Sequence, residues 1–141
     1  MQDILVPVDG SQGANRAARF AAFLASELKA AVTLLHAYDA PTAAALGLAG
    51  QDKAAFDETI QGVARGSFER AKAEMGGFDV QVQTQVAVGD PAHEIVSHAQ
   101  KTHPLMIVMG TRGLSQVKEA LMGSVSDYVT RHAPCPVTIH R

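Results

Sequence analysis

Three glycines and a serine follow the most apolar strand-like segment of this chain at a fixed spacing. The segment 105–109 is apolar throughout, and after it come Gly110, Gly113 and the pair Gly123-Ser124, which gives the pattern G-x2-G-x9-G-S. A buried strand, a glycine turn and the start of a helix bring backbone N–H groups together around one point. Such a cradle suits an anion, most often a phosphate. The pattern therefore indicates nucleotide binding.

The rest of the chain alternates between two periods. Short apolar or alternating runs predict strands at 4–8, 32–38, 80–88, 105–109 and 137–140. Apolar residues at helical spacing predict helices between them, over 17–28, 56–75, the segment from Asp90-Pro91 to Ala99, and 123–132. Asp90 is the expected N-cap of the third helix, with Pro91 in its first turn. The segment 39–51 has no clear period and is expected to be a long loop.

Five strands separated by four helices predict an α/β fold with an open parallel sheet and helices on both faces, which makes three layers. The first, second and fourth strands are continuous apolar runs, as expected for strands covered on both sides. The third alternates and the fifth starts at Pro136, so both are expected at the edges. The predicted order is 3-2-1-4-5. It changes direction between strands one and four, and ligands bind at such a switch point, here beside Asp9 and 110–113.

The composition of the chain favours some classes of protein and argues against others. The chain has 141 residues, 47% of them apolar, and a net charge of −2, which favours one domain over 1–141 and argues against nucleic-acid binding. Cys135 is the only cysteine, so no internal disulfide is possible and a reducing compartment is expected. The apolar runs are too short for membrane insertion. We expect a cytoplasmic protein.

Stretches along the whole chain resemble the ATP-binding branch of the universal stress protein family. The matching stretches are 4–11, 34–37, 89–91, 109–113 and 123–126, followed by 131–137. The resemblance implies a Rossmann-like fold of the adenine nucleotide α-hydrolase type and binding of ATP, with AMP or cyclic AMP as alternatives and Mg²⁺ held with the phosphates. It also implies a homodimer through the last strand, 133–140. The polar end of this strand, 138–141, departs from the family pattern.

Some of the candidate contacts follow from the resemblance. It assigns Pro7 to a wall of the nucleotide site and Ala37 to backbone contacts with adenine, whereas composition alone would put both in the core. It assigns Asp9 to ribose hydroxyls or to the Mg²⁺ on the phosphates. The alternative for Asp9 is a cap of the following helix, a role that Ser11 could also fill. Met109 belongs to the matching glycine motif.

The glycine motif supplies the phosphate contacts. Gly110 and Gly113 are interpreted as points where phosphate and ribose come too close for a Cβ, or as an ordinary turn with positive φ. Ser124 is the expected N-cap of the last helix, accepting from the N–H of Ser126 or Asp127. Its hydroxyl and the N–H groups of Ser124, Val125 and Ser126 would bind phosphate oxygens, together with the N-cap segment at Gly123. Arg112 would neutralise phosphate charge, or is simply solvated.

The six histidines do not predict a metal site. His36 lies inside an apolar strand, where a hydrogen-bonded core histidine is expected. His93 and His98 are five apart and share no helix face, and His132, Cys135 and His140 lack zinc-like spacing. The first βα turn carries neither G-x-G-x-x-G nor G-x4-G-K-[ST], which argues against NAD and against a P-loop.

Three functions remain open. The leading hypothesis is an ATP-binding stress-response or regulatory module, in which loops 39–51 and 111–122 order over the nucleotide and so tune the dimer surface and an unknown protein partner. The second is a slow ATPase or autophosphorylating enzyme, although only Asp9 and Arg112 stand near the expected phosphates and no dedicated catalytic residue is identified. The third is a dimeric interaction protein whose function does not depend on nucleotide.

Overall fold

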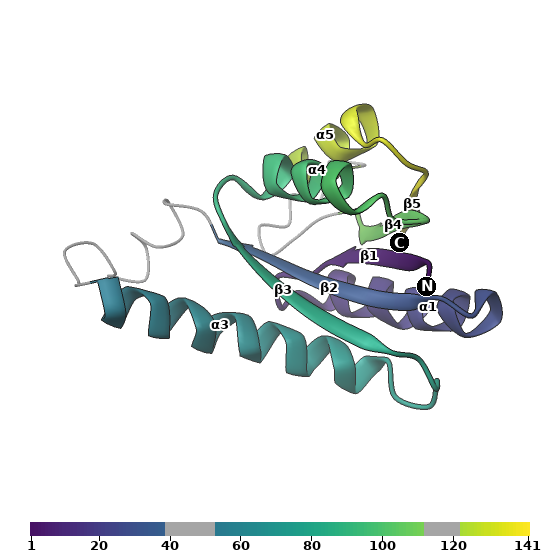
Figure 1. Cartoon of the computed structure of the whole chain (residues 1–141), viewed down its shortest axis with the longest axis horizontal. Helices are drawn as coiled ribbons and strands as arrows, with labels where there is room; N and C mark the ends of the chain where they lie inside the picture. Colours follow the sequence, from purple (N-terminus) through teal and green to yellow (C-terminus); the bar gives the residue numbers. More distant parts are fainter. Residues whose placement is uncertain (39–52, 112–121) are drawn as a thin grey trace.

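A computed structural model describes residues 1–38, 53–111 and 122–141, and within them every strand is parallel to its neighbours (Figure 1). The order along the sheet is β3-β2-β1-β4-β5, which confirms the predicted 3-2-1-4-5. The strands are β1 (Asp3–Pro7), β2 (Ala31–Tyr38), β3 (Val82–Val88), β4 (Met106–Gly110) and β5 (Val137–His140). The helices are α1 (Gln12–Leu28), α3 (Lys53–Glu74), α4 (Pro91–Thr102) and α5 (Ser124–His132).

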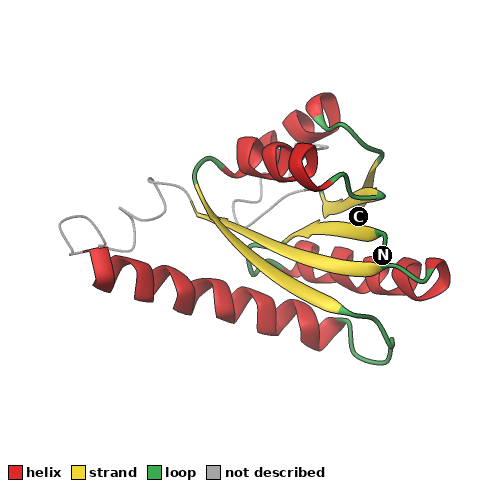
Figure 2. Ribbon diagram, viewed as in Figure 1, coloured by secondary structure: helices red, strands yellow, loops and turns green. Residues whose placement is uncertain are grey.

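Among the described helices, α1 and α3 cover one face of the sheet and α4 and α5 cover the other, as the three-layer prediction requires (Figure 2). Side chains of a strand alternate between the faces, so Ile4 and Val6 of β1 join the core under α1 and α3. Leu5 between them joins the second core, under α4 and α5. None of the described helices is long and apolar enough to cross a membrane.

Central and edge strands differ in burial as their sequences predict. Residues Ile4 to Val6 of β1 and Ile107 to Met109 of β4 are fully or almost fully buried. In β3, by contrast, every residue from Val82 to Val88 is half-buried or exposed, and β5 is half-buried along its whole length. The third strand begins at Val82, two residues after the predicted start, because Val80 and Gln81 precede the regular pairing with β2.

The start of α4 agrees with the sequence prediction, whereas the helix continues past Ala99 to Thr102. Asp90 is its N-cap, with the carboxylate accepting from the backbone N–H of His93 at 3.1 Å, and Pro91 is in the first turn. The His93 ring nitrogen Nδ1 is also 2.6 Å from the same carboxylate oxygen. These bonds lower the pKa of Asp90, the backbone N–H of His93 contributing most. The cap fixes where the helix starts after β3.

A face made of alanine allows α1 to lie close to the sheet. The buried alanines of this helix are Ala14, Ala17, Ala18, Ala21, Ala22 and Ala25. The closest approach is at the end of β4, where a Cβ on Gly110 would lie 3.1 Å from the carbonyl carbon of Gly13 and 3.2 Å from its oxygen. Gly110 does not have a positive φ, so the proposed turn conformation is not its reason for being glycine. Contact with the backbone of α1 is a structural reason that the sequence analysis did not consider.

Replacing Gly110 by alanine should destabilise the fold. Its new methyl group would meet helix backbone rather than a movable side chain, and overpacking of this kind costs about 1–3 kcal/mol. Gly62 in α3 is the matched control: nothing lies within 4 Å of its missing Cβ, so Gly62→Ala should stabilise the helix by about 0.5–1 kcal/mol. Urea denaturation of both variants measures these changes. Equal effects would contradict the close packing at β4.

Candidate functional site

The carboxyl ends of β1, β2 and β4 bring three predicted site residues, Pro7, Ala37 and Met109, to one face of the sheet. Leu5, Leu35 and Met109 belong to the core beneath α4 and α5. Pro7 and Ala37 lie two residues beyond Leu5 and Leu35, so strand alternation puts them on that same face. Pro7 and Ala37 are half-buried, whereas Met109 is only 5% exposed. Pro7 and Ala37 therefore carry most of the surface at which a ligand could be reached.

The backbone carbonyl of Thr111 joins the end of β4 to the start of α5. It accepts from the N–H of Gly123 at 2.6 Å and from the Ser126 hydroxyl at 2.7 Å. The Ser126 hydroxyl also lies 3.2 Å from the carbonyl of Gly123, and Ser126 is buried. One carbonyl thus holds the beginning of α5 beside the carboxyl end of the central strand. No motif in the sequence pointed to this role of Thr111.

The N-cap of α5 is Gly123, not Ser124 as predicted. Gly123 has extended backbone angles and no side-chain bond caps the helix, while Ser124 is its first helical residue and is exposed. The first backbone bond within this helix runs from the N–H of Asp127 to the carbonyl of Gly123. The N–H groups of Ser124, Val125 and Ser126 precede that bond and have no carbonyl to accept them inside the helix. Together they form the positive end of the helix dipole.

Asp9 and Ser11 each stabilise the β1–α1 turn by accepting a different backbone hydrogen bond. Ser11 is the N-cap of α1, accepting from the N–H of Ala14 at 3.2 Å, so Asp9 is not the cap. Asp9 Oδ1 accepts from the N–H of Ser11 at 2.9 Å and so braces the turn. Between them, Gly10 has φ +88°, a conformation that favours glycine. A Cβ there would also lie 2.8 Å from Nη2 of Arg70, which brings a cation of α3 next to this turn.

His36 holds the strand end that leads into Asp9. Pro7 has no N–H, and the ladder between β1 and β2 continues through Val8, whose N–H donates to the carbonyl of Leu35 at 2.9 Å. The His36 ring donates from Nδ1 to the carbonyl of Val8 at 3.0 Å, since a carbonyl can only accept. The residue is 5% exposed, which confirms the predicted hydrogen-bonded core histidine. Burial lowers the pKa of His36, against a smaller opposite effect of the Val8 bond.

Three of the other histidines pack against aromatic rings, and one of them, His140, lies opposite Gly110 in the register of β4 and β5. His93 of α4 and His132 of α5 both contact the ring of Tyr128, at centroid distances of 4.7 and 4.0 Å. His140 packs against Phe20 of α1. In the described ranges, no three histidine, cysteine, aspartate or glutamate side chains gather where they could hold a metal ion.

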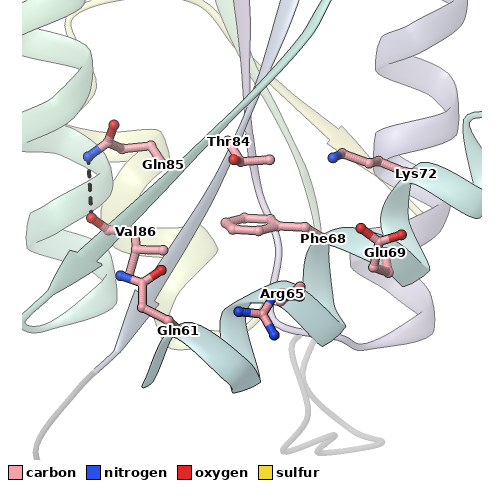
Figure 3. Close-up of a pocket in the computed structure, with 8 residues that line it drawn as sticks. All are labelled: Gln61, Arg65, Phe68, Glu69, Lys72, Thr84, Gln85 and Val86. Atoms are coloured by element: carbon pink, nitrogen blue, oxygen red, sulfur yellow. Dashed lines mark hydrogen bonds between the residues drawn. The ribbon is translucent and has the colours of Figure 1, made fainter. Parts of the chain in front are cut away.

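Part of the predicted site lies outside the described residues. Arg112, Gly113 and the loops 39–51 and 112–121 belong to that part of the chain. A groove of about 380 Å³ lies elsewhere, between α3 and β3, and none of its lining residues is a predicted nucleotide contact (Figure 3). The described site is therefore an edge: a wall of Pro7 and Ala37, a braced Asp9, and the open end of α5.

An open parallel sheet whose switch point faces a helix N-terminus defines the Rossmann-like class of α/β proteins. The chain belongs to the universal stress protein family, since the model of that family matches residues 1–141.

Relatives and solved structures agree with this assignment. The chain is 35% identical to universal stress protein YxiE of Bacillus subtilis, over 98% of this chain and 97% of that protein. It superposes on the structure of hypothetical protein MJ0577 with a TM-score of 0.77 and 27% identity, covering 98% of this chain and 94% of that one. A universal stress protein in complex with cAMP is similar at a TM-score of 0.70 and 27% identity, covering 99% and 96%.

Acid should weaken the fold through His36. Because its pKa in the folded chain is below the ordinary 6.5, the unfolded chain takes up this proton first as the pH falls. The contribution to stability is complete above the unfolded pKa and is lost as the pH falls through the folded pKa. Between about pH 7.5 and about pH 5.5, the free energy of unfolding of His36→Gln should therefore fall less than that of the wild type in urea denaturation.

His98 provides the control for this measurement. Burial, followed by the charge of Lys101, lowers its pKa as well, but its side chain is half-buried and bonds no strand end. His98→Gln should remove a smaller part of the pH dependence. Parallel pH profiles for the wild type and His36→Gln would rule out His36 as the main titrating group.

Proposed function

We propose that this chain binds ATP, with Mg²⁺ on its phosphates, at the switch point between β1 and β4. The observation that carries the proposal is the position of α5, which begins at Ser124 and is tied to the end of β4 through Thr111. Three N–H groups without helical acceptors and the positive end of a dipole stand where the glycine motif ends. This is the chemistry that a phosphate group requires.

A relative supports an adenine nucleotide as the ligand. A universal stress protein that is 27% identical to this chain has been solved in complex with cAMP, and the match covers 99% of this chain. Cyclic AMP shares adenine, ribose and phosphate with ATP and AMP. We prefer ATP because the full G-x2-G-x9-G-S spacing provides glycine and amide positions for more than one phosphate.

The remaining contacts follow from the same edge. Pro7 and Ala37 would line the base and ribose, and Asp9 would reach the ribose hydroxyls or Mg²⁺ with carboxylate oxygen. Arg112 and Gly113 would complete the phosphate contacts. Asp9 Oδ1 already accepts a backbone bond at 2.9 Å, so we assign it to binding rather than to a catalytic role.

The bound nucleotide would regulate rather than react. We propose a homodimer through the last strand, 133–140, whose surface and protein partner change with nucleotide state. β5 supports such pairing because it is an edge strand, with β4 as its one neighbour among the described strands. A single cysteine, Cys135, supports the cytoplasm as the location.

Native mass spectrometry of protein purified without added nucleotide tests ligand and oligomer together. The expected result is a dimer that carries an adenine nucleotide. After the ligand is removed, ATP with Mg²⁺ should raise the melting temperature, because it binds the folded state alone. The proposal would be overturned if the purified protein carried no nucleotide and millimolar ATP did not change its melting temperature.

Replacing Ser124 by proline should separate binding from folding. Proline is favoured at the first helical residue and lacks an N–H, and Gly123 before it has φ −74° and ψ 166°, which a following proline tolerates. Loss of one amide bond to a charged phosphate should weaken ATP binding roughly tenfold in isothermal titration calorimetry. The melting temperature without nucleotide should stay near that of the wild type.

Ser124→Ala is the matched control, because it removes the hydroxyl and keeps the N–H. It should weaken ATP binding less than Ser124→Pro does, if the backbone is the main phosphate donor. Unchanged affinity in the proline variant would place the phosphate away from α5.

A further inference from the structure

The outer edge of β3 is long and carries no charge. The segment from Val80 to Gly89 contains only valine, glutamine, threonine, alanine and glycine. Natural sheets usually protect such an edge with lysine, proline, a bulge or a very short strand. β3 has none of these protections, since it is seven residues long and contains neither lysine nor proline. The edge at β3 is therefore built as if another strand should pair with it.

The hydrogen bonds between β2 and β3 show which backbone groups of β3 face outward. The N–H of Val32 donates to the carbonyl of Gln81, and the N–H of Gly89 donates to the carbonyl of Tyr38. In a parallel pair every second residue bonds to the neighbour, so the odd-numbered residues 81–89 bond to β2. The N–H and C=O groups that point away from the sheet belong to Val82, Thr84, Val86 and Val88.

These outward groups lie open to solvent on the strand. Val88 is 61% exposed and Thr84 is exposed. The amide of Gln85 donates to the carbonyl of Val86 at 3.3 Å, a long bond at an exposed site that an incoming strand can replace (Figure 3). The side chains of Val82 and Val86 pack toward α3, so a strand added here would direct alternate side chains toward that helix.

A groove lies where the side chains of an added strand would point. It has a volume of about 380 Å³ and lies between α3 and β3, with the ring of Phe68 pointing into it (Figure 3). Two cations of α3, Arg65 and Lys72, line the groove with one carboxylate, Glu69. Neither cation has an ion-pair partner within the part of the chain that the structure describes. The lining thus offers an excess of positive charge to whatever enters.

We infer that β3 is a docking strand for an extended, acidic segment of a partner protein. The backbone of that segment bonds to the outward groups of Val82, Thr84, Val86 and Val88, and its carboxylates face Arg65 and Lys72. Main-chain bonds provide affinity in this mode of recognition, and the groove provides selection. The inference does not rest on nucleotide binding, because no residue of the switch point takes part.

Peptide binding tests the charge preference. The probes are fluorescent synthetic peptides as long as β3, one of alternating threonine and glutamate and one of alternating threonine and lysine, measured by fluorescence anisotropy without nucleotide. The glutamate peptide should bind at least about tenfold more tightly at low salt, since two charge pairs are gained. The double variant Arg65→Glu, Lys72→Glu should reverse this preference. Equal binding of the two peptides to the wild type would overturn the inference.

Controls locate the bound peptide. Lys101→Glu on α4 changes one exposed cation away from the groove and should leave the preference unchanged. Thr84→Pro removes an outward N–H without breaking the ladder to β2, and should abolish binding of the glutamate peptide while the chain still folds. If that variant does not fold, amide exchange of the wild type decides. The peptide should slow exchange at Val82, Thr84, Val86 and Val88, and no slowing at these residues would contradict a paired strand.

A second copy of this chain is the competing occupant. Sedimentation velocity without peptide distinguishes it, because self-pairing at β3 would give an assembly that Thr84→Pro dissociates. That result would replace the acidic segment with a homotypic contact and overturn the inference. Assembly that persists in Thr84→Pro supports an open β3 edge.

Discussion

The close approach of α1 to the switch point is the constraint on which the rest of the structure depends. At Gly110 the end of β4 meets the backbone of α1 with no room for a Cβ, and the alanine face of the helix continues this contact along the sheet. Because α1 packs this closely against the sheet, the conformation of the β1–α1 turn before it is restricted. Asp9 and Ser11 must therefore close that turn with their own side chains, through one bond each to backbone N–H groups. The same packing that stabilises the core thus fixes the position of the carboxylate at the candidate site.

A second fixed point lies across the switch point, at Thr111. Its carbonyl accepts two short bonds from residues near the start of α5, one from backbone and one from the buried Ser126 hydroxyl. These two bonds hold Thr111 against the start of α5. A ligand at this edge would meet donors already held in place, so less of its binding free energy would be spent on ordering them.

The edge and central strands could be predicted from sequence because strands buried on both faces are apolar throughout, whereas edge strands alternate or are short. Apolar β1, β2 and β4 differ from the alternating β3 and the short β5, and this difference places the latter two at the edges, where the structure has them. The roles of individual residues near the site could not be predicted in the same way. Glycine at 110 has the same sequence signal whether it admits a ligand or a helix, and Gly123 and Ser124 are both acceptable N-caps. The roles of Thr111 and of the groove beside Phe68 depend on the relative placement of distant elements, which no local pattern records.

Strand β2 lies between the two surfaces for which we propose binding, at the switch point and at the outer edge of β3. On one side its residues bond to β1, where Leu35 accepts from Val8 and His36 donates to the same residue. On the other side the carbonyl of Tyr38 accepts from Gly89 at the end of β3. Alternate residues of a single strand therefore hold the wall of the switch point and the docking edge. A displacement of the end of β2 would have to break hydrogen bonds on both sides of the strand.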